Sequence, residues 1–256
     1  MDNKEKSWCR VAVQVIAHRG ASKYAPENTL PAFQLAYDLK ADGIEFDVHL
    51  TKDRIPIIIH DEEIGRTTNG QGYVRDYTYR ELKELDAGSW FSDEFTGTKI
   101  LSLQELLEWL DSKSLFLNIE LKNNKYDYPQ LELLTYELIA DYQMIERTCF
   151  STFNPESVKR LRAIDSKAEI AYLTSKSRPD LVSFTKQLGA NAVHLHKRLV
   201  KRNLVRQAQE ENLIVRVYTV NKPLSLIRYS RFCQVNGIIT DVPDLAKTYA
   251  GRLKWK

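Results

Sequence analysis

Residues 43–60 read GIEFDVHLTKDRIPIIIH, and this stretch decides the fold. Its two apolar runs, 43–50 and 55–60, have the length and the β-branched content of strands. Only four residues link them, whereas a crossover between parallel strands needs a dozen or more. The second run is therefore expected to return antiparallel to the first, as the arm of a β-hairpin.

Outward from this hairpin, short apolar runs alternate with amphipathic stretches along the chain. The further strands that this pattern predicts are 11–17, 115–121, 148–152, 169–173, 192–195, 214–220 and 237–240. The predicted helices are 30–40, 103–110, 131–142, 155–164, 179–188, 199–211, 223–229 and 244–249. Such alternation is typical of a parallel sheet with crossover helices, and eight units close into a barrel. With the hairpin arm set aside, eight strands remain, so we predict an α/β fold, a TIM-type (β/α)8 barrel. The pattern leaves open that the arm is itself a barrel strand.

Residues 61–100 interrupt the rhythm with five glycines and several aromatic residues. Forty residues are too many for a plain loop in a compact domain. We therefore expect a single catalytic barrel over residues 1–256, with a small inserted subdomain at 61–100. We place this subdomain over the barrel mouth and expect an aromatic cluster to stabilise it.

Composition narrows the class of protein. The length of 256 residues is close to the ~250 of a single β/α barrel. A net charge of +3 is too small and too dispersed to favour nucleic acid as a partner. The three cysteines, Cys9, Cys149 and Cys233, lie far apart and are odd in number, which favours a reducing compartment, the cytoplasm.

The chain offers no clear membrane segment. Residues 1–10 are charged and lack the apolar stretch of a signal peptide. The longest apolar runs have the length of strands, far below a membrane span. The basic tail, 252–256, is expected to be a solvated end rather than a stable membrane anchor.

Charged side chains gather where three predicted strands end. His18 and Arg19 follow the first strand, and Glu45 and Asp47 lie in the second, near His60 and Asp61 at the end of its hairpin arm. Glu120 and Lys122 close the strand at 115–121. In β/α barrels the carboxyl ends of the strands carry the active site. We therefore expect these side chains to meet at the barrel mouth.

The three carboxylates predict a metal site. Glu45 and Asp47 are two residues apart on a strand, so both side chains point to one face. Their mutual repulsion and desolvation would be relieved by a divalent cation, with Glu120 as a third ligand. An all-oxygen ligand set favours Mg²⁺ or Ca²⁺. The alternative is a set of salt bridges to Arg19 and Lys122.

The remaining polar residues suit phosphoryl chemistry. Imidazoles titrate near neutral pH, so His18 and His60 can serve as a general acid and a general base. Arg19 can grip two phosphate oxygens, and Lys122 supplies a point charge. The alternative for both cations is that they tie down Glu27 or Asp61.

Several sequence runs together resemble the signature of the glycerophosphodiester phosphodiesterase family. They are VIAHRG (15–20), APENT (25–29), GIEFDV (43–48), LTKD (50–53), PIIIHD (56–61), NIELK (118–122), FSTF (150–153), YTVN (218–221) and GIITD (237–241). The resemblance implies hydrolysis of a small glycerophosphodiester to an alcohol and glycerol 3-phosphate. It implies a divalent metal on Glu45, Asp47 and Glu120, with His18 and His60 as acid and base. It also implies phosphate contacts from Arg19 and Lys122. Tyr218 stands where many relatives carry tryptophan, and it is expected to line the substrate pocket.

Other readings stay open from the sequence. A lysophospholipid-directed relative would need an apolar landing surface near the mouth, and a non-catalytic phosphoglyceride-binding barrel should have lost some of these residues. We expect His49 at the rim or in solvent, and we do not expect the His194-Leu-His196 run to bind metal. Asn28 is considered only as a helix cap, with Thr29 as the alternative cap, and Glu27 only as a neighbour of Arg19 or of the helix start. Phe153, Trp90 and Phe91 are possible contacts of the glycerol or head group, with packing as the alternative.

Overall fold

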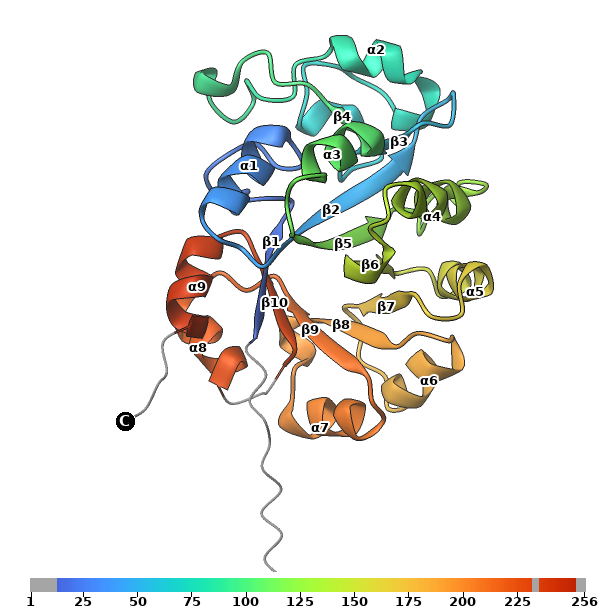
Figure 1. Ribbon diagram of the computed structural model, residues 1–256, viewed down its shortest axis with the longest axis vertical. Helices are drawn as coiled ribbons and strands as arrows, with labels where there is room; N and C mark the ends of the chain where they lie inside the picture. The colour runs from blue at the N-terminus through green and yellow to red at the C-terminus, as the bar shows by residue number, and fades with distance from the viewer. Residues whose placement is uncertain (1–12, 232–234, 252–256) are drawn as a thin grey trace, which may run out of the picture.

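The barrel is closed by eight parallel strands. The computed structural model describes residues 13–231 and 235–251 (Figure 1). Within them, β1 pairs with both β10 and β2, which joins the two ends of the sheet. The barrel strands in spatial order are β1 (Gln14–His18), β2 (Gly43–Leu50), β5 (Phe116–Leu121), β6 (Thr148–Thr152), β7 (Glu169–Thr174), β8 (Ala192–His196), β9 (Ile214–Tyr218) and β10 (Gly237–Thr240). The predicted (β/α)8 barrel is confirmed. Cys9, Cys233, the segment 1–10 and the tail 252–256 lie outside the described residues.

The hairpin arm stays outside the barrel. Strand β3 (Pro56–Ile58) pairs antiparallel with β2, with Val48 opposite Ile58. A further strand, β4 (Leu101–Ser102), pairs with β3 and was not predicted, because two residues leave no periodic signal. The short link at 51–54 thus sets the strand count, as expected.

Helices alternate with the barrel strands and surround them (Figure 1). They are α1 (Leu30–Asp38), α3 (Leu103–Leu110), α4 (Leu131–Asp141), α5 (Pro155–Ile164), α6 (Leu181–Gln187), α7 (Arg202–Glu210), α8 (Pro223–Arg231) and α9 (Pro243–Gly251). Helix α3 has the predicted bounds because Ser102 and Glu105 form a capping box and its four leucines are buried. Helix α7 begins three residues later than predicted, because residues 197–199 form the 3-10 turn η5 (Lys197–Leu199).

The insertion at 61–100 has its own small core. It contains η1 (Ile64–Arg66), η2 (Val74–Asp76), α2 (Tyr79–Glu84) and η3 (Asp93–Phe95). Its buried apolar side chains are aliphatic, with Ile64, Val74 and Leu82 packed against the hairpin arm. The expectation that an aromatic cluster stabilises the insertion was therefore only partly right. Tyr77 and Tyr79 are half-buried, since their hydroxyls bond polar groups, and Trp90 remains 39% exposed. The division into one catalytic domain, 1–256, with an insertion over its mouth stays a prediction.

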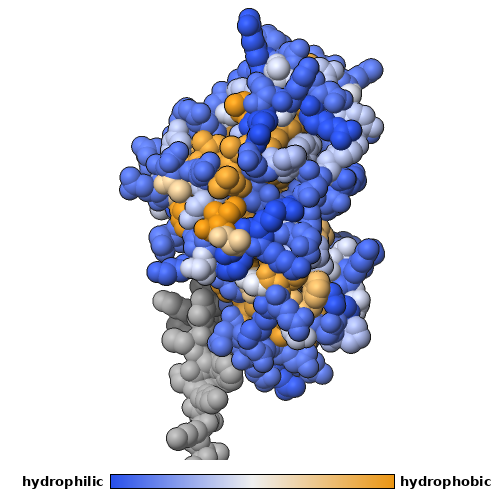
Figure 2. Space-filling view, turned by 90° about the vertical axis from the view of Figure 1, so that its right-hand side faces the viewer, coloured by the Kyte–Doolittle hydropathy of each residue, from blue (hydrophilic) through white to orange (hydrophobic). Residues whose placement is uncertain are grey.

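The face of the molecule in Figure 2 is mainly hydrophilic, and its hydrophobic surface is broken into separate patches. Among the helices of residues 13–231 and 235–251, none has the length and apolar character that a bilayer crossing requires.

A substitution at Gly43 tests the close contact at the start of the β2–β5 pairing. A Cβ atom there would lie 2.5 Å from the carbonyl oxygen of Phe116, its partner on β5. Gly43→Ala is expected to lower the free energy of unfolding by about 1–3 kcal/mol, measured by urea denaturation. Gly65→Ala is the control, because its nearest atom would be 3.4 Å away. Equal stability of the two variants would contradict this packing.

Candidate active site

Strand register brings the three acidic residues together. His18 lies opposite Glu45 on β1 and β2, and Asp47 lies opposite Glu120 on β2 and β5. Glu45, Asp47 and Glu120 each offer a carboxylate oxygen, and these oxygens all lie within 4.8 Å of one another. The carboxyl ends of the strands therefore carry one compact acidic cluster, as the sequence predicted.

The acidic cluster is short of hydrogen-bond donors. Glu45 and Asp47 are buried, and Asp47 Oδ1 has no hydrogen-bond partner among the described residues. Asn28 Nδ2 donates to Asp47 Oδ2 over 2.9 Å, and the Arg19 amide donates to Glu45 Oε2 over 2.9 Å. Burial, followed by the charge of Asp47, raises the pKa of Glu45 to about 8. A divalent cation fits this site, because hard oxygen donors with an unmet demand for positive charge are its preferred ligands.

Two cations lie against the cluster. Arg19 Nε is 3.2 Å from Asp47 Oδ2, and Lys122 Nζ is 2.8 Å from Glu120 Oε1 and 3.6 Å from Asp47 Oδ1. Burial alone would raise the pKa of Asp47, but Arg19 and Lys122 outweigh it and hold that pKa well below its usual range. The salt bridges considered from the sequence are therefore present, in the same place as the candidate metal ligands.

His18 is oriented by the carboxylate of Asp241, the residue that directly follows β10. Its Nδ1 lies 2.6 Å from Asp241 Oδ1, and its Nε2 lies 4.0 Å from Glu45 Oε2. Asn221 Nδ2 and Ser22 Oγ donate to Asp241 and fix that carboxylate in turn. A carboxylate at Nδ1 favours the proton there. In the neutral imidazole the free lone pair is then on Nε2, the nitrogen near Glu45. Burial lowers the pKa of His18, but Glu45 and Asp241 outweigh it and raise that pKa.

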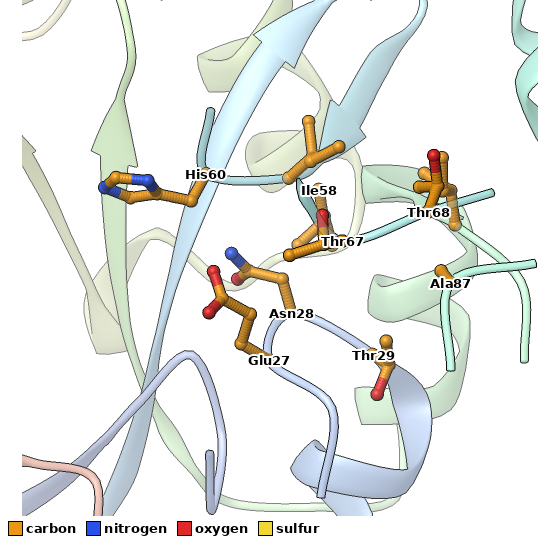
Figure 3. Close-up of a pocket in the computed structure, with 10 residues that line it drawn as sticks. Glu27, Asn28, Thr29, Ile58, His60, Thr67, Thr68 and Ala87 are labelled. Carbon is orange, nitrogen blue, oxygen red and sulfur yellow. The ribbon is translucent and has the colours of Figure 1, made fainter. Parts of the chain in front are cut away.

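His60 has a similar partner with different support. Its Nδ1 is 2.6 Å from Asp61 Oδ1, and Asp61 also bonds the guanidinium of Arg66 from the insertion. Arg66 makes two further hydrogen bonds, of 2.9 and 2.7 Å, to Glu27. Figure 3 shows Glu27 and Asn28 beneath His60, at one end of a small pocket whose other end is lined by Thr68 and Ala87. The insertion thus reaches the mouth through Arg66.

Tyr218 stands close to the acidic cluster at the end of β9. Its hydroxyl is buried and has no hydrogen-bond partner among the described residues. Its ring lies edge-on to Phe153, at a centroid distance of 6.2 Å, and to His196, at 5.7 Å. Burial, and then the Glu120 carboxylate, raise the pKa of Tyr218. A buried hydroxyl without a partner beside the mouth suits the predicted contact with substrate.

The expectation for His49 was wrong. The side chain is fully buried, with Nε2 3.1 Å from the carbonyl oxygen of His60 and Nδ1 3.1 Å from the Tyr128 hydroxyl. Burial lowers its pKa to about 4. The sequence could not show this, because Tyr128 covers the imidazole from a distant loop. His49 holds the backbone of His60 in place.

Sequence reasoning missed four polar neighbours of the site. Asp241 and Asn221 lay within the motifs but received no role, Asn28 was considered only as a helix cap, and Arg66 carried no signal. Of the two residues expected as the helix cap, Thr29 occupies the cap position, and its side chain makes no capping bond. His194 lies outside the acidic cluster, and Arg216 Nη1 lies 3.3 Å from its Nε2.

Comparisons with known proteins agree with this geometry. The sequence model of the glycerophosphoryl diester phosphodiesterase family matches residues 18–245. A glycerophosphodiester phosphodiesterase from Caldanaerobacter subterraneus subsp. tengcongensis is 37% identical over 230 residues, covering 90% of this chain and 94% of the relative. One from Bacillus altitudinis is 38% identical over 238 residues, covering 91% and 96%.

Solved structures show the same arrangement of strands and helices. A phosphodiesterase from Oleispira antarctica, in complex with the product sn-glycerol-3-phosphate, superposes with a TM-score of 0.87 at 29% identity and covers 93% of this chain and 96% of its own. A glycerophosphodiester phosphodiesterase from Agrobacterium tumefaciens gives a TM-score of 0.80 at 30% identity, with coverage of 93% and 99%.

The buried carboxylates lead us to expect that, in the presence of a chelator, the free energy of unfolding depends on pH. The pKa of Glu45 is raised from 4.5 to about 8, so folding favours its protonated form, and stability falls as pH rises through this window. The raised pKa of His18 acts in the same direction. Between pH 5 and 8 the free energy of unfolding should fall by ~2–4 kcal/mol, measured by urea denaturation in EDTA. Added Mg²⁺ or Ca²⁺ should offset the loss, and Glu45→Gln should flatten the profile. A variant that keeps the wild-type slope would contradict the assignment to Glu45.

Proposed function

This chain belongs to the glycerophosphoryl diester phosphodiesterase family, and on that premise we propose that it is a metal-dependent glycerophosphodiester phosphodiesterase. It hydrolyses glycerophosphodiesters to an alcohol and glycerol 3-phosphate. The observation that carries the proposal is the convergence of three carboxylates, two cations and two imidazoles at one barrel mouth. The product bound to the Oleispira antarctica phosphodiesterase supports this substrate class.

The cation, Mg²⁺ or Ca²⁺, would be held by Glu45, Asp47 and Glu120. When bound, it supplies positive charge that stabilises the extra negative charge on the phosphoryl oxygens in the transition state. Asn28 and the Arg19 amide keep two of the carboxylates in position, because each donates to one of their oxygens.

Arg19 and Lys122 bind the phosphodiester in this proposal. Both are tethered by carboxylates, Arg19 by Glu27 and Asp47 and Lys122 by Glu120, so their charges are fixed before substrate arrives. Charges that need no reorganisation during the reaction are the most effective ones for phosphoryl chemistry. Tyr218, whose hydroxyl has no partner in the described part of the chain, contacts the substrate beside them.

His18 and His60 exchange protons with the reacting oxygens. Each has Nδ1 bound to an aspartate, so Nε2 is the atom that takes or gives a proton. One histidine removes a proton from the attacking oxygen, and the other protonates the departing alkoxide. Asp241 and Asp61 are positioning residues, because they act on the reaction through the imidazoles.

Two other readings differ in substrate or in class. A lysophospholipid substrate would use the same residues and remains the second candidate. A non-catalytic binding barrel is disfavoured, because both histidines, both cations and all three carboxylates are present and close together. Cytoplasmic location, inferred from the cysteine content and consistent with the free buried thiol of Cys149, forms part of the same proposal.

A substrate panel tests the reaction. Glycerophosphodiesters with different head groups should release glycerol 3-phosphate, detected with a coupled assay, in the presence of Mg²⁺ or Ca²⁺ but not of EDTA. Glu120→Gln should lower kcat/KM at least ~10²-fold, whereas Glu156→Gln, on the exposed pair with Lys159, should leave it unchanged. Full turnover in EDTA would remove the metal from the proposal. Release of free alcohol and lysophosphatidate from lysophospholipids alone would favour the second candidate.

Single substitutions test the proton transfers. His18→Ala and His60→Ala should each lower kcat by ~10²–10⁴-fold while circular dichroism shows a folded barrel. Asp241→Asn should lower kcat by ~10² or more with little change in KM, because an amide can donate to Nδ1 and so favour the wrong tautomer. Asp244→Asn is the matched control, since Asp244 bonds the Tyr24 hydroxyl nearby. Near-normal kcat for either alanine variant would exclude that histidine from proton transfer.

A further inference from the structure

The loops that follow β7, β8 and β9 carry unbalanced charge. Residues 175–180, 196–203 and 219–224 contain seven lysines or arginines and a single aspartate, Asp180. That aspartate pairs with Arg178 at 2.8 Å. The other six cations are exposed, and we call five of them the cationic rim: Lys176, Lys197, Arg198, Lys201 and Lys222.

The cationic rim forms one surface beside the active site. Strands β7, β8 and β9 are neighbours in the barrel, and their following loops therefore adjoin. Lys197 Nζ donates to the carbonyl oxygen of Thr219 over 2.8 Å, and the Tyr229 hydroxyl donates to the Lys197 carbonyl over 2.9 Å. Burial, followed by Arg198 and Lys197, lowers the pKa of His196, which lies against Tyr218. The positive field therefore reaches the edge of the mouth.

A protruding aliphatic side chain belongs to the same surface. Leu224 is 83% exposed, whereas the other exposed large hydrophobic residues that are described range from 37% to 40%. It lies in the first turn of α8, two residues after Lys222. Because α8 starts where β9 has ended, Leu224 stands at the same end of the barrel as the cationic rim. A single exposed leucine is ordinary by itself, and Leu224 matters here because it protrudes beside the cationic rim.

The opposite side of the barrel has the opposite charge. The insertion at 61–100 contains nine acidic and five basic residues. Figure 1 shows the insertion at one end of the view and α7 at the other. A negatively charged surface would therefore attract one side of the molecule and repel the other, which fixes the orientation in which it can approach.

We propose that the cationic rim and Leu224 dock reversibly on a lipid bilayer that contains anionic phospholipids. Lysine and arginine side chains are attracted to the anionic head groups, and the leucine enters the boundary between head groups and acyl chains. A few cations and one aliphatic side chain give peripheral contact, distinct from a spanning segment or a permanent anchor. Docking places the barrel mouth beside the membrane, and it goes beyond the proposed hydrolysis without depending on it.

An extended lipid surface fits these residues better than a single small anion. The rim cations are exposed and come from three loops, whereas a site for one phosphate converges on one point. A purely electrostatic partner such as nucleic acid would gain nothing from Leu224. The pairing of dispersed cations with a single protruding aliphatic group is the chemistry of a charged interface with an apolar interior.

Co-sedimentation with vesicles tests the docking. The full chain is mixed, without substrate or divalent cations, with vesicles of phosphatidylglycerol and phosphatidylcholine or of phosphatidylcholine alone, at low and high salt. Binding should require phosphatidylglycerol and weaken with salt. Arg198→Glu with Lys222→Glu should weaken it at least ~25-fold, since each cation near the surface is worth about fivefold. Leu224→Ser should weaken it up to about tenfold.

The control changes the same charge at the other end of the barrel. Lys40→Glu with Lys167→Glu alters two exposed lysines that precede β2 and β7. Because these lysines lie away from the cationic rim, this double variant should bind vesicles within about twofold of the wild type. Failure of the wild type to sediment with anionic vesicles would overturn the proposal. So would equal loss in both double variants, or equal binding to a DNA oligonucleotide with no effect of Leu224→Ser.

Discussion

The structure depends on three carboxylates placed within 4.8 Å of one another inside a barrel mouth. Like charges buried together repel and lose hydration, so this arrangement is costly unless positive charge surrounds it. Arg19 and Lys122 supply two such charges from the strand ends next to the cluster. Asp47 Oδ1 nevertheless has no hydrogen bond within residues 13–231 and 235–251, which leaves the cluster with an unmet demand for a cation.

A chain of alternating charges extends this constraint to the insertion. Asp47 contacts Arg19, Arg19 contacts Glu27, Glu27 contacts Arg66, and Arg66 contacts Asp61. Asp61 in turn holds His60, so the insertion is linked electrostatically to a candidate proton carrier. His18 instead relies on Asp241, which is fixed by the neutral donors Asn221 and Ser22. The two imidazoles thus have equivalent geometry but different electrostatic support.

The two sides of the barrel mouth also differ in net charge. The insertion brings net negative charge to one side, and the loops after β7, β8 and β9 bring net positive charge to the other. The loops are the part of a β/α barrel that can change without loss of the fold, and here they give the two sides of the mouth opposite net charge.

The barrel and the acidic cluster could be predicted from the amino-acid sequence alone. Alternating strands and helices, together with the four-residue link at 51–54, fixed the eight barrel strands. Glu45 and Asp47 alternate on β2 and Glu120 lies near the end of β5, and the parallel register brings the three together. These features are local or follow from the period of a strand, so a linear pattern records them.

The polar partners that hold those residues in position became visible only in the folded molecule. Asp241 reaches His18 across 223 positions of sequence, and Arg66 reaches Glu27 across 39. His49 has the strand parity of the acidic pair, yet a tyrosine from a distant loop buries it. Contacts of this kind depend on how the barrel closes and on where each loop folds back. No periodic pattern along the chain encodes them, because the partners meet only after the strands have paired.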